Sequence, residues 1–347
     1  MEKTIKQFQV KGDLKSITTI NEGLINSTFL VLTTTEKYIL QKINTFIFKN
    51  VEELMFNINS VTTFLKKQNK TTLTIVKNKN NELFIIENGE YWRMFNFIEN
   101  TQTFDKATST ILASESGKTI AKFHKSFSDF TDTLYNTIPN FHNTGHILNQ
   151  FKDTLTKIDE KLKKECIKEI NFILEKEKDC NKIQKLIKKG KIEKKVCHND
   201  TKISNILFDK DEKSVCLIDF DTIMIGTILT DISDAIRTIC VSETEEESDL
   251  TKVHFKLDYF KCFILSYLKE NERKMSKTEI DNIVFSVKLI FLEQGIRFLE
   301  DYLNGDIYYN TKHDKQNLVR AKNQLHLCLE VEKQTQKMND IISDYFN

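Results

Sequence analysis

The sequence contains little proline and little glycine, with one Pro and nine Gly among its 347 residues. Flexible and semi-rigid linkers are rich in these residues, so the composition argues against domains joined by such linkers. An apolar run of the length that a membrane-spanning helix needs is missing, and residues 1–10 lack the apolar core of a signal peptide. We therefore expect a cytoplasmic protein that has no membrane partner.

An excess of charge of one sign is also missing, since 51 Lys and Arg balance 50 Asp and Glu. A net charge of +1 provides no field that attracts a polyanion, so nucleic acid is not expected as a partner. The seven cysteines are odd in number and form no Cys-x-x-Cys pair, which predicts reduced thiols. The length suggests two domains or lobes with a substantial core, while the oligomeric state stays open.

The most informative stretch is residues 196–221. Two short apolar runs, at 206–208 and 215–218, flank a polar segment, a pattern typical of a β-hairpin with a longer loop. Folding this hairpin brings Asn205 close to Asp219, and Asp200 lies in the loop before the first strand. Carboxylate and amide oxygens suit a hard cation that also binds phosphate, so the hairpin predicts an Mg²⁺ site at Asn205 and Asp219.

The spacing His198-x-Asp200-x-x-x-x-Asn205, followed by Asp219, repeats the catalytic loop and the metal-binding Asp of kinases. Here the chain resembles the aminoglycoside phosphotransferases and choline kinases, small-molecule kinases that share the protein-kinase fold. The resemblance implies that Asp200 accepts the proton of the substrate hydroxyl and that Asn205 and Asp219 hold the Mg²⁺ of Mg-ATP. We assign Lys202 an electrostatic role on the transferred phosphoryl group. Each residue alone could be a turn or cap residue, but the ordered set disfavours that alternative.

This resemblance implies an α+β, protein-kinase-like fold with two lobes. Residues 1–97 would form a nucleotide-binding lobe of an antiparallel sheet and a helix, and residues 98–347 a mostly helical catalytic and substrate-binding lobe. Periodicity predicts strands at 16–20, 27–32, 38–44, 73–75, 83–86 and 92–98 and a helix at 51–64. Further helices are expected around 111–127, over 149–189 as one or two long helices, from an N-cap at Asp231, and at 255–268 and 283–303.

The nucleotide site is expected in the first of these lobes. The loop that contains Gly23 and Asn26 would cover the ATP phosphates, because Gly lets backbone N–H groups approach phosphate. Period-two alternation places Gln41 and Lys42 on opposite faces of a strand, so only one of them can face the phosphates, and both remain open. If Gln41 faces inward, the usual strand cation is missing.

Three further features bear on this site. Glu52 or Glu53 could pair with the strand cation, although a solvated glutamate in the first turn of a helix is an equal alternative. Backbone groups near Asn96 and Ile98 would bind adenine at the hinge between lobes. The string Ser-Gly-Lys-Thr at 116–119 resembles the end of a P-loop, but position 112 is Leu where that motif needs Gly, so a helix surface is predicted. His124 is expected to be a packing histidine.

A closer resemblance narrows the substrate. The strings Tyr-Ile-Leu-Gln-Lys-Ile-Asn from residue 38, Tyr-Trp-Arg-Met-Phe-Asn-Phe-Ile-Glu-Asn from 91 and Arg-Phe-Leu-Glu-Asp-Tyr-Leu-Asn-Gly-Asp-Ile-Tyr-Tyr from 297 are similar to the N-acetylhexosamine 1-kinases. The similarity implies ATP-dependent phosphorylation of the anomeric hydroxyl of N-acetylglucosamine or N-acetylgalactosamine. It also implies that Arg297 and Tyr308 bind sugar hydroxyls, with Asp301 one turn from Arg297. The alternative for Arg297 and Asp301 is an ordinary i,i+4 pair.

Two other classes of function remain. A kinase of the same fold could act on an aminoglycoside, choline or homoserine; an acidic substrate pocket would favour the first two, and the sequence indicates none. A nucleotide-binding pseudoenzyme is supported only by the doubtful Gln41 and is opposed by Asp200, Asn205 and Asp219.

Overall fold

The computed structural model describes residues 1–20, 25–272 and 274–347. The chain divides into two compact units. The first contains Met1–Thr101, Asp129–Pro139 and Ile218–Met224, and the second contains Gln102–Ser128, Asn140–Leu217 and Ile225–Asn347. The boundary expected after residue 97 therefore falls after Thr101, and two later segments return to the first unit.

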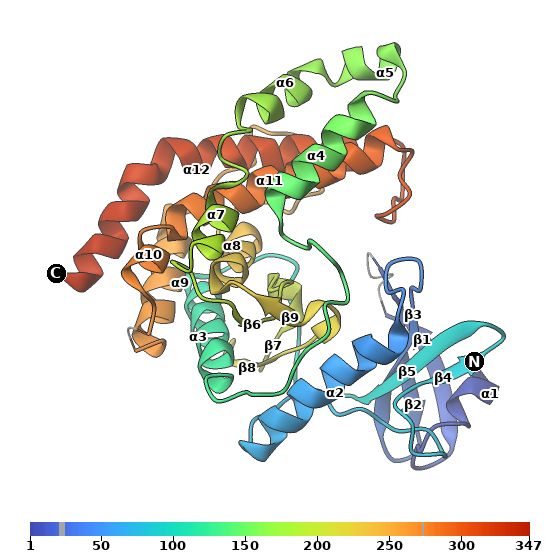
Figure 1. The fold of residues 1–347 in the computed structure, drawn as a ribbon. Helices are drawn as coiled ribbons and strands as arrows, with labels where there is room; N and C mark the ends of the chain where they lie inside the picture. The colour runs from blue at the N-terminus through green and yellow to red at the C-terminus, as the bar shows by residue number, and fades with distance from the viewer. Residues whose placement is uncertain (21–24, 273) are drawn as a thin grey trace. The chain divides into compact units, whose positions relative to one another are not determined.

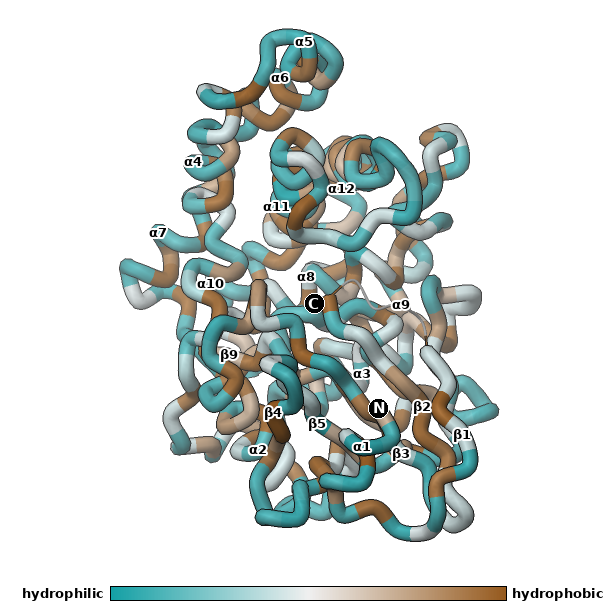
Figure 2. The backbone as a smooth tube through the Cα atoms, turned by 90° about the vertical axis from the view of Figure 1, so that its right-hand side faces the viewer, coloured by the Kyte–Doolittle hydropathy of each residue, from teal (hydrophilic) through white to brown (hydrophobic). Residues whose placement is uncertain are grey.

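The first unit contains a five-stranded antiparallel sheet (Figure 1). Its spatial order is β1 (Leu14–Thr19), β2 (Ser27–Thr33), β3 (Lys37–Ile43), β5 (Glu90–Asn96) and β4 (Ile85–Glu87). One face buries alternate residues of β3 and β5 against the N-terminal segment with α1 (Glu2–Ile5), namely Tyr38, Leu40, Trp92 and Met94 with Ile5 and Phe8. The sequence of β2 is Ser-Thr-Phe-Leu-Val-Leu-Thr, and Figure 2 shows the strand as mostly hydrophobic. Aromatic and β-branched residues of this kind favour a strand.

Most of the predicted strands are confirmed, with ends that differ by a few residues. The strand predicted at 73–75 is wrong, because this segment forms only the isolated bridge between Ile75 and Phe95. It continues the edge of β5 beyond the short β4, where Val76 N–H donates to the Met94 carbonyl at 2.8 Å. The chain then turns toward the N-terminal segment, so no ladder develops.

Helix α2 (Val51–Lys67) holds the two returning segments in the first unit. Asn50 caps the start of the helix, because its side chain accepts the Glu53 N–H. Inside it, the Asn57 amide donates to the carbonyls of Tyr135 at 2.9 Å and Ile223 at 3.1 Å and accepts the Tyr135 N–H at 2.8 Å. One buried amide therefore satisfies backbone groups from both segments, which explains their place in this unit.

The second unit is mostly helical, with α3 (Thr110–Ser126), α8 (Ile228–Ile239), α9 (Leu257–Glu270), α10 (Lys277–Ile280), α11 (Ile283–Leu303) and α12 (Gln316–Phe346). The helices α11 and α12 lie side by side (Figure 1). The Ser-Gly-Lys-Thr string lies inside α3, so its interpretation as a helix is confirmed. Gly117 permits close packing there, because a Cβ atom would clash with the Phe263 carbonyl of α9. Within the described ranges, no helix is long and apolar enough to cross a membrane.

The prediction of one or two long helices over 149–189 is wrong. The structure has four: α4 (Thr144–Leu155), α5 (Glu160–Glu165), α6 (Ile167–Glu175) and α7 (Lys182–Lys188). Asp159 caps α5 by accepting the Lys161 N–H at 2.7 Å, which starts a new helix where the hydrophobic period continues. Figure 2 shows α5 as mainly hydrophilic, as expected from the sequence Glu-Lys-Leu-Lys-Lys-Glu.

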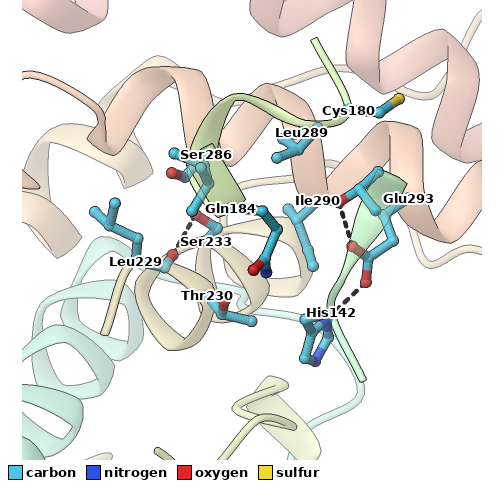
Figure 3. Close-up of a pocket in the computed structure, with 12 residues that line it drawn as sticks. His142, Cys180, Gln184, Leu229, Thr230, Ser233, Ser286, Leu289, Ile290 and Glu293 are labelled. Atoms are coloured by element: carbon cyan, nitrogen blue, oxygen red, sulfur yellow. Dashed lines mark hydrogen bonds and ion pairs between the residues drawn. The ribbon is translucent and has the colours of Figure 1, made fainter. Parts of the chain in front are cut away.

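A small cavity lies among α7, α8, α11 and the start of α4 (Figure 3). Its lining is mixed, with apolar residues of α8 and α11 and the polar side chains of His142, Thr144, Gln184, Ser233 and Glu293. Two short sheets and two 3-10 helices complete the described elements. The sheets pair β6 (Lys195–Cys197) with β9 (Met224–Gly226) and β7 (Ile206–Phe208) with β8 (Ser214–Leu217), and the 3-10 helices are η1 (Ile203–Asn205) and η2 (Phe220–Thr222).

Candidate active site

The predicted hairpin is confirmed. Strands β7 and β8 are antiparallel, with Ile206 opposite Leu217 and Leu207 opposite Cys216. The Asp209 carboxylate stabilises the turn by accepting the N–H groups of residues 211 and 213 at 2.8 and 2.9 Å. Asn205 immediately precedes β7, and Asp219 follows β8 by two residues in the sequence.

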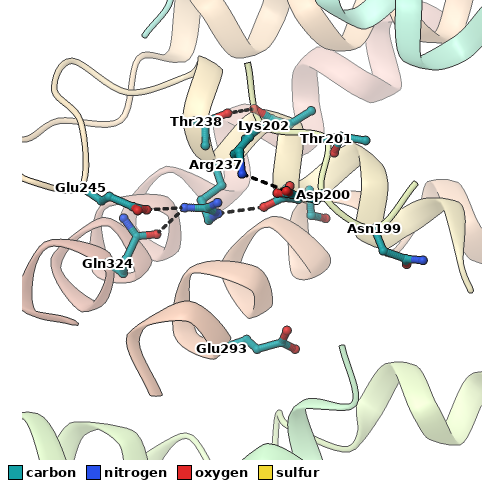
Figure 4. Close-up of polar contacts among 12 residues, drawn as sticks. Asn199, Asp200, Thr201, Lys202, Arg237, Thr238, Glu245, Glu293 and Gln324 are labelled. Carbon is teal, nitrogen blue, oxygen red and sulfur yellow. Dashed lines mark hydrogen bonds and ion pairs between the residues drawn. The ribbon is translucent and has the colours of Figure 1, made fainter. Parts of the chain in front are cut away.

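Asp200, Lys202 and Asn205 form one hydrogen-bonded group before the hairpin, and Figure 4 shows the contact between Lys202 and Asp200. Lys202 Nζ lies 2.9 Å from Asp200 Oδ2, and Asn205 Nδ2 donates to the same oxygen at 3.0 Å. Burial by itself raises the pKa of Asp200, but the Lys202 ammonium, with smaller effects of His198 and Arg237, holds that pKa below its ordinary value. The carboxylate is therefore ionised at neutral pH, and the Asn205 amide oxygen is the side-chain atom left to bind a cation.

Asp231 holds the backbone of the loop that contains Asp200. Its carboxylate is fully buried and accepts the N–H groups of His198 at 2.8 Å and Asn199 at 2.7 Å. The prediction that Asp231 is an N-cap is wrong, because α8 begins at Ile228 and Thr227 caps it. The bond back to this loop is made by Asp231 and not by Asp234, which lies one turn later in α8.

Asp234 instead pairs with Arg237, a buried residue that the sequence reasoning did not single out. Arg237 Nε donates to Asp234 at 2.9 Å, and Nη1 donates to Glu245 at 2.9 Å and Gln324 at 3.4 Å (Figure 4). The only sequence signal was an i,i+3 acid–base pair, which is common on exposed helix faces. His124, expected to be a packing histidine, is buried with its ring nitrogens 2.9 Å from the Tyr267 hydroxyl and 2.8 Å from Asp231.

In the first unit, Gln41 and Lys42 lie on opposite faces of β3, as alternation predicted. Lys42 Nζ pairs with Glu90 at 3.0 Å and remains 39% exposed. The Gln41 side chain faces the sheet surface that α2 covers, where its Oε1 accepts from Arg93 Nε at 3.0 Å. Lys42 is thus a solvated strand lysine, and its acidic partner is neither Glu52 nor Glu53.

Arg93 is the buried cation of this face. It lies opposite Gln41 in the β3–β5 register, and its side chain is 1% exposed. Its guanidinium binds Asp221 through two atoms, with Nη1 to Oδ1 at 2.5 Å and Nη2 to Oδ2 at 2.8 Å. Asn26 donates to Asp221 Oδ2 at 2.6 Å and accepts the Asn44 N–H at 2.9 Å. The pair therefore joins β5, the start of β2 and the turn that begins with Asp219.

Sequence reasoning missed Arg93, although a signal existed. A lone arginine in a strand whose neighbours are Trp, Met and Phe can be buried only with a carboxylate partner. Its partner, Asp221, is 128 positions later in the chain, so the sequence alone did not identify the pair.

The remaining nucleotide-site residues have different outcomes. Gly23 lies outside the described residues. The Asn96 N–H is not available to adenine, because it donates to the Thr74 carbonyl at 2.9 Å. The Ile98 carbonyl accepts from the Thr101 hydroxyl at 2.7 Å, and within the described residues the Ile98 N–H has no recorded partner. The hinge thus offers the Ile98 N–H as its available donor.

The assignment of Asp301 as a substrate-binding residue is wrong. Its carboxylate is 6% exposed and accepts four hydrogen bonds of 2.7 to 2.9 Å, from the N–H groups of Ile307, Tyr308 and Tyr309 and from Asn317 Nδ2. Each oxygen accepts two bonds, so no lone pair is left for a sugar hydroxyl or for Arg297. Asp301 instead shapes the loop that carries Tyr308.

Arg297 has a different environment from Arg93 and Arg237. Its guanidinium carbon lies 5.1 Å from the ring centre of Phe141 and 5.6 Å from those of Tyr308 and Tyr309. Its one recorded hydrogen bond, to the Tyr308 hydroxyl, is 3.5 Å long, and no carboxylate among the described residues forms an ion pair with it. Arg297 is therefore a half-buried cation whose N–H donors are largely uncommitted.

Comparisons with known proteins identify the family of this chain. The family model described as the phosphotransferase enzyme family matches residues 16–257, more than half of the chain. The chain belongs to this phosphotransferase family. Within the described residues, no cluster of three or more His, Cys, Asp and Glu side chains is arranged to hold a metal.

Solved structures show the same fold. An aminoglycoside phosphotransferase from Alicyclobacillus acidocaldarius is 11% identical, with a TM-score of 0.62 and coverage of 99% of this chain and 96% of that one. The spectinomycin phosphotransferase in complex with ADP and spectinomycin is 13% identical, with a TM-score of 0.60 and 94% coverage of each chain. Choline kinase from Streptococcus pneumoniae is 16% identical, with a TM-score of 0.55 and coverage of 92% and 94%. The predicted protein-kinase-like α+β fold is confirmed.

Proposed function

We propose that the protein is an ATP- and Mg²⁺-dependent kinase that phosphorylates the anomeric hydroxyl of an N-acetylhexosamine, either N-acetylglucosamine or N-acetylgalactosamine. Membership of the phosphotransferase family supports the reaction class. The observation that carries the choice of acceptor is the Arg297 guanidinium, which lies beside Tyr308 without a carboxylate partner among the described residues. Such a group donates hydrogen bonds to the oxygen atoms of an acceptor and repels a cationic one.

The Asp200 carboxylate would accept the proton of the attacking hydroxyl. Its pKa is held below the ordinary value, so the basic form is present at neutral pH. An anomeric hydroxyl is more acidic than an ordinary alcohol, so one carboxylate suffices, and such a base contributes about 10² to 10⁴ in rate. Lys202, which contacts Asp200, would turn its ammonium toward the transferred phosphoryl group and neutralise part of its charge.

Asn205 and Asp219 would hold Mg²⁺. Both offer the hard oxygen ligands that this ion requires, and the Asn205 amide nitrogen is already committed to Asp200. The hairpin register supports the pairing, since Asn205 precedes β7 and Asp219 follows β8. When bound, the ion would supply positive charge that neutralises part of the charge of the ATP phosphates.

The nucleotide would bind to the first unit. The Ile98 N–H is our candidate donor to adenine, and Gly23, Asn26 and Gln41 remain proposed phosphate-site residues. Lys42 leaves this set because its ammonium pairs with Glu90 on the other face of β3.

Cationic acceptors fit this site less well. Choline and aminoglycosides carry positive charge, and recognition of that charge requires carboxylates or open aromatic faces. Here the rings of Phe141, Tyr308 and Tyr309 surround Arg297, which already fills the aromatic site with a cation.

The test is an ATP-consumption screen with N-acetylglucosamine, N-acetylgalactosamine, glucose, galactose, choline, homoserine and kanamycin. We expect turnover with an acetylated sugar and none with choline or kanamycin. Turnover only with another acceptor would refute the sugar assignment and keep the kinase. ATP binding without turnover on any acceptor would favour the pseudoenzyme.

A further inference from the structure

We infer that His142 is a positioning residue that acts as an imidazolium, holding the peptide bond before Asp200 by donating from both ring nitrogens. The inference rests on the proposed role of Asp200 as the base. His142 lies just before α4, at one end of the cavity in Figure 3, and its partners are Glu293 of α11 and Asn199 of the catalytic loop.

The two hydrogen bonds determine the charge of the ring. His142 Nδ1 lies 2.7 Å from Glu293 Oε1, and Nε2 lies 2.9 Å from the Asn199 carbonyl oxygen. A carbonyl can only accept, and so can an ionised carboxylate. A neutral imidazole has one donor nitrogen and one acceptor nitrogen, so it can make only one of these bonds. Both bonds form together only when the ring is doubly protonated.

The surroundings are consistent with a buried cation. The side chains of His142 and Glu293 are 6% and 2% exposed, so each charge needs the other. Burial by itself lowers the pKa of His142, but the Glu293 carboxylate and the Asn199 carbonyl outweigh burial and raise that pKa above its ordinary value. Glu293 remains ionised, since His142 and a 2.6 Å bond from the Thr144 hydroxyl offset its burial and keep its pKa low.

The other groups around the ring, on α11, before α7 and on α8, do not outweigh the effect of Glu293. On α11, Arg297 opposes protonation of His142 through its like charge, and this effect is smaller than that of Glu293. The residue before α7 that lines the cavity is Cys180, whose pKa is raised by burial to about 12, so its thiol stays neutral. Helix α8 contributes Leu229, Thr230 and Ser233, which carry no charge.

The contact acts on a strained part of the catalytic loop. Asn199 has a φ of 63° and His142 has a φ of 54°. Both angles lie in the left-handed region, which residues other than Gly rarely adopt. The N–H of Asn199 is held by Asp231 and its carbonyl by His142. Both ends of the residue before Asp200 are thereby fixed, and loss of the His142 bond would release one of them.

The first test measures protonation directly and needs no acceptor. Protein labelled with ¹⁵N-histidine is titrated by NMR, and the His142 signals are assigned by their loss in His142→Gln. We expect both ring nitrogens to be protonated at pH 7 and to titrate above the ordinary value of about 6.5. A neutral His142 ring at pH 7 would overturn the inference, even if the acceptor of the kinase is still unknown.

The second test is kinetic. In His142→Gln we expect kcat to fall about tenfold with little change in KM for ATP, because a small misplacement of a reacting group is costly. We also expect kcat of the wild-type enzyme to fall at alkaline pH, where His142 loses a proton. This fall should be absent in His142→Gln, since an amide does not titrate there. His146→Gln, the same substitution one turn into α4, is the matched control and should keep the wild-type profile. A His142→Gln enzyme with wild-type kcat and an unchanged alkaline limb would contradict the positioning role.

If His142→Gln does not fold, Glu293→Gln provides a second variant. Removing the carboxylate charge should lower the pKa of His142, moving both the NMR titration and the alkaline limb to lower pH. An unchanged titration would contradict the assigned partner. Failure of every acceptor in the kinetic assay would count against the proposed function and leave the NMR result valid.

Discussion

At the residue scale, Arg93 and Asp221 form an ion pair that is buried from solvent, so water cannot solvate one member if the other is removed. Their side chains are 1% and 6% exposed. Removing one member of such a pair leaves an uncompensated buried charge, whereas replacing both avoids that cost. The pair therefore adds little to the net free energy of unfolding, but removing either member alone is costly.

We predict that Arg93→Met lowers the free energy of unfolding by about 3–5 kcal/mol, because Asp221 becomes a buried charge without a counter-ion. Urea denaturation measures the effect. Lys42→Met on the neighbouring strand is the matched control, with an exposed partner and a loss of about 0.5 kcal/mol or less. The double variant Arg93→Met with Asp221→Leu should recover part of the loss. Equal stability of the two single variants would contradict the prediction.

The second prediction at this scale concerns the base. Asp200→Asn should fold like the wild type, because an amide oxygen can still accept from Lys202 and Asn205. Turnover should fall about 10²-fold or more, since the amide cannot take a proton. Steady-state kinetics and circular dichroism measure the two properties. Asp340→Asn on the exposed side of α12 is the control, and undiminished activity of Asp200→Asn would remove the base assignment.

At the element scale, the loop after α11 depends on one carboxylate. Asp301 accepts three consecutive backbone N–H groups, at 307, 308 and 309, and so sets the direction of the Tyr308 side chain relative to Arg297. A helix that ends at Leu303 is thereby followed by a loop with a fixed backbone. We propose the substrate role for Arg297 and Tyr308, and Asp301 would act through them.

We predict that Asp301→Asn raises KM for the acceptor sugar and leaves KM for ATP unchanged, because the amide nitrogen cannot accept the N–H groups it faces. Arg297→Gln should raise the same KM by about 10-fold or more, the loss of a charged hydrogen bond. Asp314→Asn, an exposed residue between α11 and α12, is the control. A parallel rise in KM for ATP would indicate a general loss of structure and would count against this reading.

At the scale of the whole molecule, the cysteines are thiols that burial protects. All seven are free, and six of them are buried. Burial raises the pKa of Cys166 to about 11 and the pKa values of Cys180, Cys216 and Cys328 to about 12. The reactive thiolate is therefore scarce in the folded protein at neutral pH.

We predict that a thiol reagent at pH 8 labels only the half-buried Cys262 rapidly in the native protein. All seven cysteines should react once a denaturant unfolds the chain. A time course followed by mass spectrometry identifies the labelled positions. Rapid native labelling of several cysteines would show that the helical unit opens far more often than its burial implies.

The elements near the catalytic loop were predictable because their determinants are close together in the chain. The hairpin, the order of His198, Asp200, Asn205 and Asp219, and the helix at Ile283–Leu303 follow from spacing and periodicity that act over a few residues. The breaks among α4 to α7 were missed, since capping by Asp159 interrupts a helix without interrupting its hydrophobic period.

By itself, the sequence determined the hairpin and the spacing of the residues around Asp200, since local patterns encode both, and the resemblance carried by these residues implied the kinase-like fold. Tertiary structure alone decided which buried charges meet: Arg93 with Asp221 across 128 positions and His142 with Glu293 across 151. The reason is physical. A hydrophobic period predicts which face of a helix or strand is buried. A buried charge, however, is stabilised by a partner whose position depends on how the whole chain packs.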